Sequence, residues 1–195
     1  MQNGKSNLFE RDRSALLVID VQQSFLDKLP LDVRGPLVER IAWAMRVARH
    51  LDIPIVATAE DIERCGPLMP ELADELPAGA TVFNKMIFGL MDQPDIRHAV
   101  EATKRDQFVL VGLETDVCIS HSAFGLRAAG YRPAVIDDAC HTPPPHHEHA
   151  LRRLRDAGIE VLSLKGIYYE WMRDLATLKR IKPKMNDPLP AGLTL

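Results

Sequence analysis

The sequence predicts an α/β protein with three layers: a doubly wound, Rossmann-like, mostly parallel sheet of six strands with helices on both faces. Two observations lead to this prediction. Short apolar runs alternate along the chain with segments of helical periodicity, a pattern typical of strand–helix–strand crossovers. Several of these runs are almost continuously apolar rather than alternating, as in strands that are buried on both faces.

The six expected strands are short and end close to polar residues. They cover residues 15–20 (ALLVID), 53–58 (IPIVAT), 81–84 (TVFN), 108–112 (FVLVG), 132–137 (RPAVID) and 159–164 (IEVLSL). Apolar residues spaced by three and four predict helices over 34–51, 95–105, 117–129, 146–157 and 167–179. Glycines follow two of these helices, at Gly130 and Gly158, as is common at helix ends. Residues 60–80 and 186–195 are expected to be irregular.

Length and composition favour one globular domain. The chain has 195 residues, of which 46% are hydrophobic and 26% charged, so a disordered, collagen-like or disulfide-scaffold chain is excluded. We expect a flexible N-terminal segment over 1–13, a single domain over 14–182 and a C-terminal tail over 183–195. The net charge of −3 argues against nucleic acid as a partner.

The start of the chain and its cysteines indicate the cellular compartment of the protein. Residues 1–13 lack the apolar core of a secretory signal, and no stretch is apolar enough for a membrane helix. The three cysteines, Cys65, Cys118 and Cys140, form no paired or zinc-binding spacing. These features predict a cytoplasmic protein that has no membrane partner.

Candidate catalytic residues follow three of the predicted strands. Asp20 ends the first strand, Lys85 follows the third, and Cys118 lies between the fourth strand and the next helix. In open α/β sheets, ligands bind beyond the carboxyl ends of the strands. A cysteine at a helix N-terminus is expected to have a lowered thiol pKa. An acid and a lysine nearby could complete a nucleophilic site.

Each of these residues also has a structural interpretation. Cys118 could be a small buried apolar residue, since free cysteines in protein interiors often are. Asp20 could cap a turn, and Lys85 could be solvated. Position alone therefore leaves the catalytic interpretation open.

Three segments resemble the isochorismatase-like cysteine hydrolase family, and in particular its small members rather than the metal-dependent nicotinamidases. They read LLVIDVQQSFL, FNKMIFGL and LVGLETDVCISHSAFGLRAAGY, and they occur in the family's order over nearly the entire chain. The third segment is the most specific, because a strand ends in Gly and a Thr precedes the Cys that opens a helix.

The resemblance implies a site and a reaction. Asp20 corresponds to the general base, Lys85 to the lysine that completes the triad, and Cys118 to the nucleophile. The family also implies a cis peptide bond between Leu113 and Glu114, with the N–H groups of Glu114 and Cys118 forming an oxyanion hole. The expected reaction is hydrolysis of a small amide, or an ester, through a covalent thioester. The alternatives are a catalytically silent structural or interaction protein of the same fold, and a thiol redox or electrophile-scavenging protein.

The sequence departs from the family's metal-binding pattern. Nicotinamidases hold a metal with an Asp-x-His pair after the second strand, whereas residues 58–62 read TAEDI here. Ile62 takes the place of the first histidine and cannot coordinate a metal. We therefore expect no metal and no other cofactor.

The resemblance also suggests residues that line the substrate pocket. An aromatic residue near Phe25 lines the pocket in relatives, Phe88 belongs to the lysine-plus-aromatic pattern, and Glu60 follows the second strand. Packing alone is an alternative for these side chains. The substrate is expected to be a small molecule.

Two further sets of residues are open to two interpretations. The apolar residues of the irregular segments form either a homo-oligomer interface or a buried loop; they are Leu68, Met69, Leu72, Leu90 and Met91. Relatives commonly assemble, so a homo-oligomer is expected. Four histidines around three prolines form either a metal-binding tract or the start of a helix, which we favour; they are His141, His146, His147 and His149.

Overall fold

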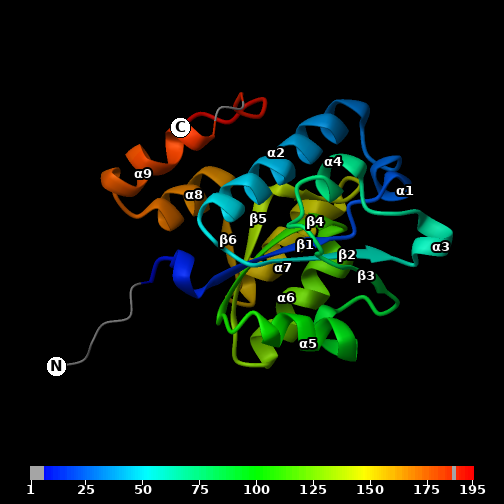
Figure 1. Ribbon diagram of the computed structural model, residues 1–195. Helices are drawn as coiled ribbons and strands as arrows, with labels where there is room; N and C mark the ends of the chain where they lie inside the picture. Colours follow the sequence, from blue (N-terminus) through cyan, green and yellow to red (C-terminus); the bar gives the residue numbers. More distant parts are fainter. Residues whose placement is uncertain (1–6, 186–187) are drawn as a thin grey trace.

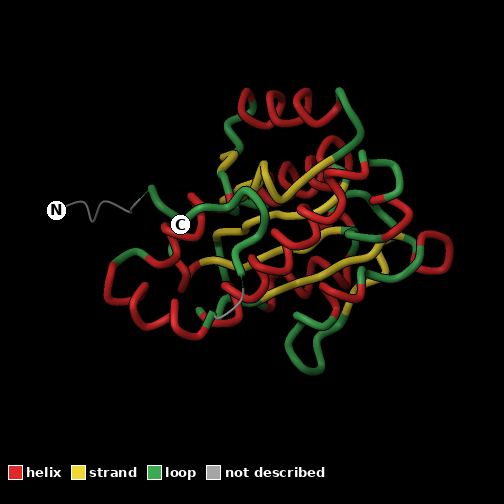
Figure 2. Tube along the Cα trace, turned by 90° about the horizontal axis from the view of Figure 1, so that it is seen from above, coloured by secondary structure: helices red, strands yellow, loops and turns green. Residues whose placement is uncertain are grey.

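The structure, a computed structural model, describes residues 7–185 and 188–195 and confirms the predicted fold class. All neighbouring strands pair in parallel, in the order β3-β2-β1-β4-β5-β6. Their bounds are β1 (Ser14–Ile19), β2 (Ile55–Glu60), β3 (Val82–Lys85), β4 (Gln107–Leu113), β5 (Arg132–His141) and β6 (Glu160–Leu162). Figure 2 shows these strands side by side through the middle of the molecule.

Helices cover both faces of the sheet (Figure 1). One face carries α2 (Leu31–His50), α8 (Leu164–Met172) and α9 (Leu175–Ile181), and the other carries α5 (Pro94–Ala102), α6 (Ser120–Ala128) and α7 (His146–Asp156). Three helices of one turn each follow β1 or β2: α1 (Gln23–Leu26), α3 (Ile62–Cys65) and α4 (Pro70–Ala73).

The two apolar layers explain why the strands are apolar at nearly every position. In β1, Leu16 and Val18 pack into the core beneath α2, whereas Leu17 and Ile19 pack into the core beneath α5 and α6. Successive side chains of a strand point to opposite faces, so a central strand covered on both sides needs apolar residues throughout. All six residues of β1 are buried.

The structure differs from the predicted elements in places that tertiary contacts decide. The second strand runs to Glu60 rather than ending at residue 58, because Glu60 pairs with Lys85 of β3. The segment 60–80 contains α3 and α4. The helix expected over 167–179 is two helices, separated at Arg173, whose φ is 63°.

The ends of the described chain lie against the domain. Phe9 is fully buried, and its N–H donates to Glu170 at 2.6 Å. Arg40 donates to the carbonyl oxygen of Ala191 at 2.9 Å. Residues 1–6 and 186–187 lie outside the described residues, so the expected limits of the terminal segments stay predictions there. No helix in the described part combines the length and hydropathy needed to cross a membrane.

The strand order places a crevice between β1 and β4. From β1 the chain builds the sheet outward in one direction through β2 and β3, and then returns to build it in the other direction through β4, β5 and β6. Such a switch point opens a crevice at the carboxyl ends of the strands. Asp20 follows β1, and a turn with Cys118 follows β4.

Gly112 allows β1 and β4 to meet closely at this crevice. Its φ is +125°, and a Cβ built on it would lie 2.0 Å from the carbonyl oxygen of Ile19. No side chain larger than hydrogen fits that separation, and the conformation itself is essentially confined to glycine. Gly112 therefore lets the end of β4, which leads to Cys118, lie close to the end of β1, which leads to Asp20.

We expect Gly112→Ala to lower the free energy of unfolding by at least about 3 kcal/mol, because the strands must separate to admit a methyl group. Gly130→Ala is the matched control. Gly130 has a φ of +86° but open space around the Cβ position, so it carries only the conformational cost of about 1–2 kcal/mol. Urea unfolding measures both, and equal losses would contradict the close-approach argument.

Candidate active site

Asp20 lies at the centre of the crevice and is fully buried. Its φ of 52° turns the chain out of β1, in a left-handed conformation that Asp tolerates better than most residues. Its N–H donates to the carbonyl oxygen of Thr58 at 3.1 Å, and the Thr58 hydroxyl donates to its Oδ1 at 2.7 Å. Thr58 thus holds both the backbone and the carboxylate of Asp20 in place.

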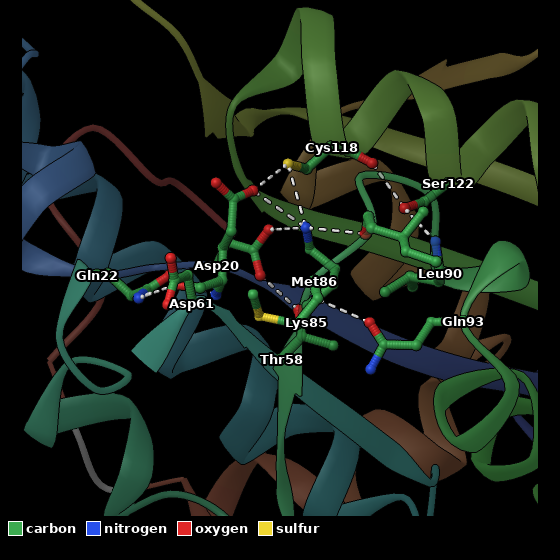
Figure 3. Close-up of polar contacts among 12 residues, drawn as sticks. Asp20, Gln22, Thr58, Asp61, Lys85, Met86, Leu90, Gln93, Cys118 and Ser122 are labelled. Atoms are coloured by element: carbon green, nitrogen blue, oxygen red, sulfur yellow. Dashed lines mark hydrogen bonds and ion pairs between the residues drawn. The ribbon is translucent and has the colours of Figure 1, made fainter. Parts of the chain in front are cut away.

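Lys85 ends β3 and is also fully buried. Its Nζ lies 3.0 Å from Asp20 Oδ2, 3.2 Å from Glu60 Oε2 and 3.5 Å from Cys118 Sγ. Figure 3 shows this amino group pointing between the carboxylate of Asp20 and the thiol of Cys118. The Lys85 ammonium therefore contacts both of the other side chains that the sequence singled out at strand ends, Asp20 and Cys118, and Glu60 as well.

Cys118 lies in a π-helical turn, Thr115–Ile119, and not in the first turn of an α-helix as expected. The N–H of Ile119 donates to the carbonyl oxygen of Glu114, five residues back, and α6 begins only at Ser120. Single π turns are frequent at functional sites. The turn lies directly beyond β4 and brings the thiol against Lys85.

Glu60 is the residue of the site that sequence reasoning placed least well. It was predicted to line the substrate pocket, but it also contacts the nucleophile: the Cys118 thiol donates to Glu60 Oε2 at 3.3 Å. Glu60 ends β2 beside Lys85. Because the second strand was expected to end at residue 58, the sequence did not indicate that Glu60 lies on this strand, paired with Lys85 and close to Cys118.

Gln22 and Thr58 were missed as positioning residues. The buried Gln22 side chain accepts from the Glu60 N–H at 2.7 Å and donates to the Glu60 carbonyl oxygen at 2.8 Å. Thr58 orients Asp20, as described above. Both lie within three residues of a strand end at the crevice, and this is the signal that could have found them.

The electrostatics of the site contradict the expected low thiol pKa. Burial raises the pKa of Cys118 above its ordinary value, the negative charges of Asp20 and Glu60 raise it further, and Lys85 offsets only part of this. The thiol is 3% exposed, and the dipole of a short turn does not outweigh that desolvation. Burial and two carboxylates thus act against the thiolate, and the Cys118 thiol hydrogen-bonds to Glu60 at 3.3 Å.

The pKa values of Asp20 and Lys85 are shifted as well. Burial raises the pKa of Asp20, although Lys85 and the Thr58 hydroxyl act against it. Burial acts to lower the pKa of Lys85, but the carboxylates of Asp20 and Glu60 reverse the direction, so that its pKa is raised. Lys85 thus stays an ammonium, and Asp20 is a stronger base than an exposed aspartate.

A pocket of about 410 Å³ opens onto the thiol. All three residues that were predicted to line it do so, and they are Phe25, Glu60 and Phe88. Cys118 and Glu114 also line it, and Lys28 lies over the Phe25 ring at 4.3 Å. The pocket is large enough for a small molecule, and the buried triad is reached through it. The peptide bond between Leu113 and Glu114, at its edge, is cis.

The same side chains could be considered as metal ligands. One oxygen each of Asp20 and Glu60 and the Cys118 sulfur lie within 4.8 Å of one another. However, the Lys85 ammonium already contacts all three, so a metal ion would have to displace a buried cation. These residues do not fit a metal. We expect full activity in the presence of a chelator, and a loss that one divalent ion restores would contradict this.

Four of the five candidate interface residues are part of the chain's own core, and the fifth, Met69, is half-buried against it. Leu68, Leu72, Leu90 and Met91 are all less than 9% exposed, so they are unavailable to a second copy. The apolar side chains that do reach the surface near the site are Met86, Ile87 and Phe88, which are 63%, 44% and 51% exposed.

The histidines at 141–149 lie at the beginning of α7 and include one stacked pair of imidazole rings. His146 opens α7, as the favoured interpretation predicts. His141 and His147 stack with their ring centroids 4.7 Å apart, and His147 Nδ1 lies 2.9 Å from the Thr115 hydroxyl. Among the described residues, the group with metal-ligand geometry contains no histidine.

Comparisons with known proteins agree with the motifs and the fold. The isochorismatase domain model matches residues 14–165. Isochorismatase domain-containing protein 2A of Mus musculus is 28% identical over 184 residues, which cover 92% of this chain and 85% of that protein. The probable hydrolase YcaC of Escherichia coli (strain K12) is 27% identical over 168 residues, which cover 85% and 80%.

Solved structures share the fold. The YcaC gene product from Escherichia coli, described as an octameric hydrolase of unknown specificity, superposes with a TM-score of 0.79 at 24% identity, over 91% of this chain and 90% of that one. Because the domain model spans well over half of the chain, this protein belongs to the isochorismatase-like hydrolase family, as its three motifs predict.

Proposed function

We propose that this protein hydrolyses a small amide, with Cys118 as the nucleophile and a covalent thioester as the intermediate. The observation that carries the proposal is the buried contact of Lys85 Nζ with Asp20 at 3.0 Å and with Cys118 at 3.5 Å, at the bottom of a pocket. A thiol, a base and a fixed cation are the groups that acyl transfer through cysteine requires.

The first half of the reaction forms the thioester. Asp20 takes the thiol proton as the Cys118 sulfur attacks the carbonyl carbon, and the raised pKa of Asp20 suits it to this transfer. The N–H groups of Glu114 and Cys118 receive the oxyanion, a contribution that is typically about 2.7–4 kcal/mol for each donor. Asp20 then returns the proton to the nitrogen of the leaving amine as the C–N bond breaks.

The second half restores the thiol. Water attacks the thioester carbonyl while Asp20 accepts one of its protons, the C–S bond breaks to release the acid, and Asp20 then returns the proton to the sulfur. Lys85 keeps its charge throughout and stabilises the sulfur as it becomes anionic. Because the pKa of the thiol is raised, the mechanism needs a base close to the sulfur, and an oxygen of Asp20 lies within 4.8 Å of it.

Trapping the intermediate tests this proposal. We expect that incubation with a panel of small primary amides, followed by an acid quench, adds the mass of one acyl group to the chain for at least one amide that is turned over. Peptide mass spectrometry should place that mass on Cys118. Turnover with an acyl group on another residue, or turnover that incorporates no acyl group under rapid quench, would contradict the proposal.

We further propose that the protein is a cytoplasmic homo-oligomer. Three apolar side chains beside the pocket, Met86, Ile87 and Phe88, are at least 44% exposed, and exposed apolar patches commonly mark interfaces. The YcaC structure named above is octameric. Light scattering of the purified protein distinguishes an assembly from a single chain.

A further inference from the structure

The pocket contains a carboxylate that the triad of Asp20, Lys85 and Cys118 does not require. We propose that this residue, Glu60, determines specificity: it favours neutral or cationic amides, whose N–H groups it can accept, and disfavours substrates with a carboxylate beside the reacting carbonyl. The inference rests on the proposed function, because it concerns what binds at the Cys118 thiol.

The orientation of Glu60 is fixed by its neighbours. Its N–H and C=O groups are both bonded to the side chain of the buried Gln22, at 2.7 and 2.8 Å. Its Oε2 accepts from Lys85 at 3.2 Å and from the Cys118 thiol at 3.3 Å. The carboxylate is therefore held against the nucleophile, and both line the same pocket.

One edge of this carboxylate remains available to a ligand. Glu60 lines the pocket, and its side chain is 13% exposed. Its Oε1 lies 3.9 Å from Arg64 Nη2, beyond hydrogen-bond distance. A carboxylate oxygen in this position accepts hydrogen bonds but cannot donate them, so it matches the N–H groups of an amide and opposes another carboxylate.

The charge at the bottom of the pocket strengthens this selection. With the thiol protonated, the carboxylates of Asp20 and Glu60 surround one ammonium, that of Lys85. One negative charge is in excess, and Glu60 is the carboxylate that reaches the pocket, because Asp20 is sealed. Charges in such a poorly solvated place interact more strongly than charges in water.

The cations at the pocket rim do not cancel this charge. Lys28 Nζ lies 3.1 Å from Glu114 Oε1, and Arg64 Nε lies 2.9 Å from Asp61 Oδ2. The side chains of Lys28 and Arg64 are 48% and 71% exposed. Lys28 is paired with Glu114, and Arg64 divides its charge between Asp61 at 2.9 Å and the more distant Glu60 Oε1 at 3.9 Å. Both cations are screened by water, so the Glu60 carboxylate keeps most of its effect at the thiol.

Two alkylating reagents measure this selection directly. Iodoacetamide and iodoacetate react by the same step, in which the S–C bond forms, the C–I bond breaks and the thiol proton goes to solvent, but only iodoacetate is anionic. The second-order rates at Cys118 are followed by peptide mass spectrometry at pH 7 and divided by those of glutathione. We expect wild type to prefer iodoacetamide beyond the glutathione ratio, and Glu60→Gln to reduce that excess preference about tenfold.

Two variants serve as controls. Glu63→Gln removes the same charge from an exposed position on α3 and should leave the ratio unchanged. Glu60→Asp keeps the charge and should keep most of the preference. Glu60→Gln should also move the pH midpoint of iodoacetamide alkylation downward, because the Glu60 carboxylate raises the pKa of the Cys118 thiol. A purely structural role for Glu60 would move neither quantity.

The outcomes separate this inference from the proposed function. A wild-type preference for iodoacetate beyond the glutathione ratio would overturn the inference without the use of any variant. An unchanged ratio in folded Glu60→Gln, with Cys118 still alkylated, would overturn it and leave the proposed function standing. If the alkylation ratios are as expected but amides are turned over without an acyl group on Cys118, the proposed function fails and the charge selection by Glu60 stands.

Discussion

Replacing Cys118 by alanine should abolish hydrolysis of every amide that the wild-type protein turns over, with a loss of at least about a thousandfold. The pocket remains, but the sulfur in contact with Lys85 and Glu60 is gone. Cys118→Ser should be almost equally inactive, because a hydroxyl gives up its proton far less readily than a thiol. Turnover is measured with the amide found in the trapping experiment.

The loss in this variant should be catalytic rather than structural. Cys118 is buried, but alanine removes only one heavy atom from it, so the thermal midpoint should fall by no more than a few degrees. Cys140→Ala is the matched control: this thiol is 1% exposed, lies within β5, and donates to the carbonyl oxygen of Leu110. It should retain turnover. Retained turnover in Cys118→Ala would exclude the thioester route.

Lys85→Met should reduce both activity and stability strongly. The substitution removes the ammonium that lies 3.0 Å from Asp20 and 3.2 Å from Glu60 and leaves two neighbouring carboxylates without their cation. Breaking a buried pair in this way costs about 3–5 kcal/mol. We expect turnover to fall by at least about a thousandfold, because the sulfur also loses the charge that stabilises it. Chemical unfolding and steady-state kinetics measure the two effects.

The loss of stability in Lys85→Met should depend on pH, because it acts through the charge of Asp20. Burial already raises the folded-state pKa of Asp20 above its unfolded value, and without Lys85 it rises further. A raised folded pKa gives stability that is present below the unfolded pKa and is lost as pH rises through the folded value. The deficit of Lys85→Met relative to wild type should therefore be smaller at pH 5 than at pH 8.

A double variant separates charge from packing. Adding Asp20→Asn to Lys85→Met removes one of the two unpaired carboxylates, so the double variant should be more stable than Lys85→Met while remaining inactive. If it were less stable by the sum of the two single losses, the buried charges would not be coupled, and the central position given to the Lys85 ammonium would be wrong.

The fold and part of the site could be predicted from local features of the sequence. The run LLVID is apolar at successive positions because β1 is covered on both faces. Asp20, Lys85 and Cys118 follow three strands, and parallel strands bring their carboxyl ends to one edge of the sheet. The structure indeed places these three side chains in contact.

Features set by pairing and burial could not be predicted in this way. The end of β2 at Glu60 depends on the register with β3, and the π turn around Cys118 depends on how the chain leaves β4. The apolar residues Leu72 and Leu90 matched an interface as well as a core, because hydrophobicity does not show which surface covers a side chain.

The sequence by itself predicted the doubly wound sheet and the candidate side chains at its edge, because apolar periodicity and residues at strand ends are local properties of the chain. The resemblance of its three motifs indicated the family. Only the tertiary structure decided that Glu60 contacts both Lys85 and Cys118 and that burial raises the pKa of the thiol. Both depend on the distances between segments far apart in sequence, and on the removal of water from charged groups that no single segment encloses.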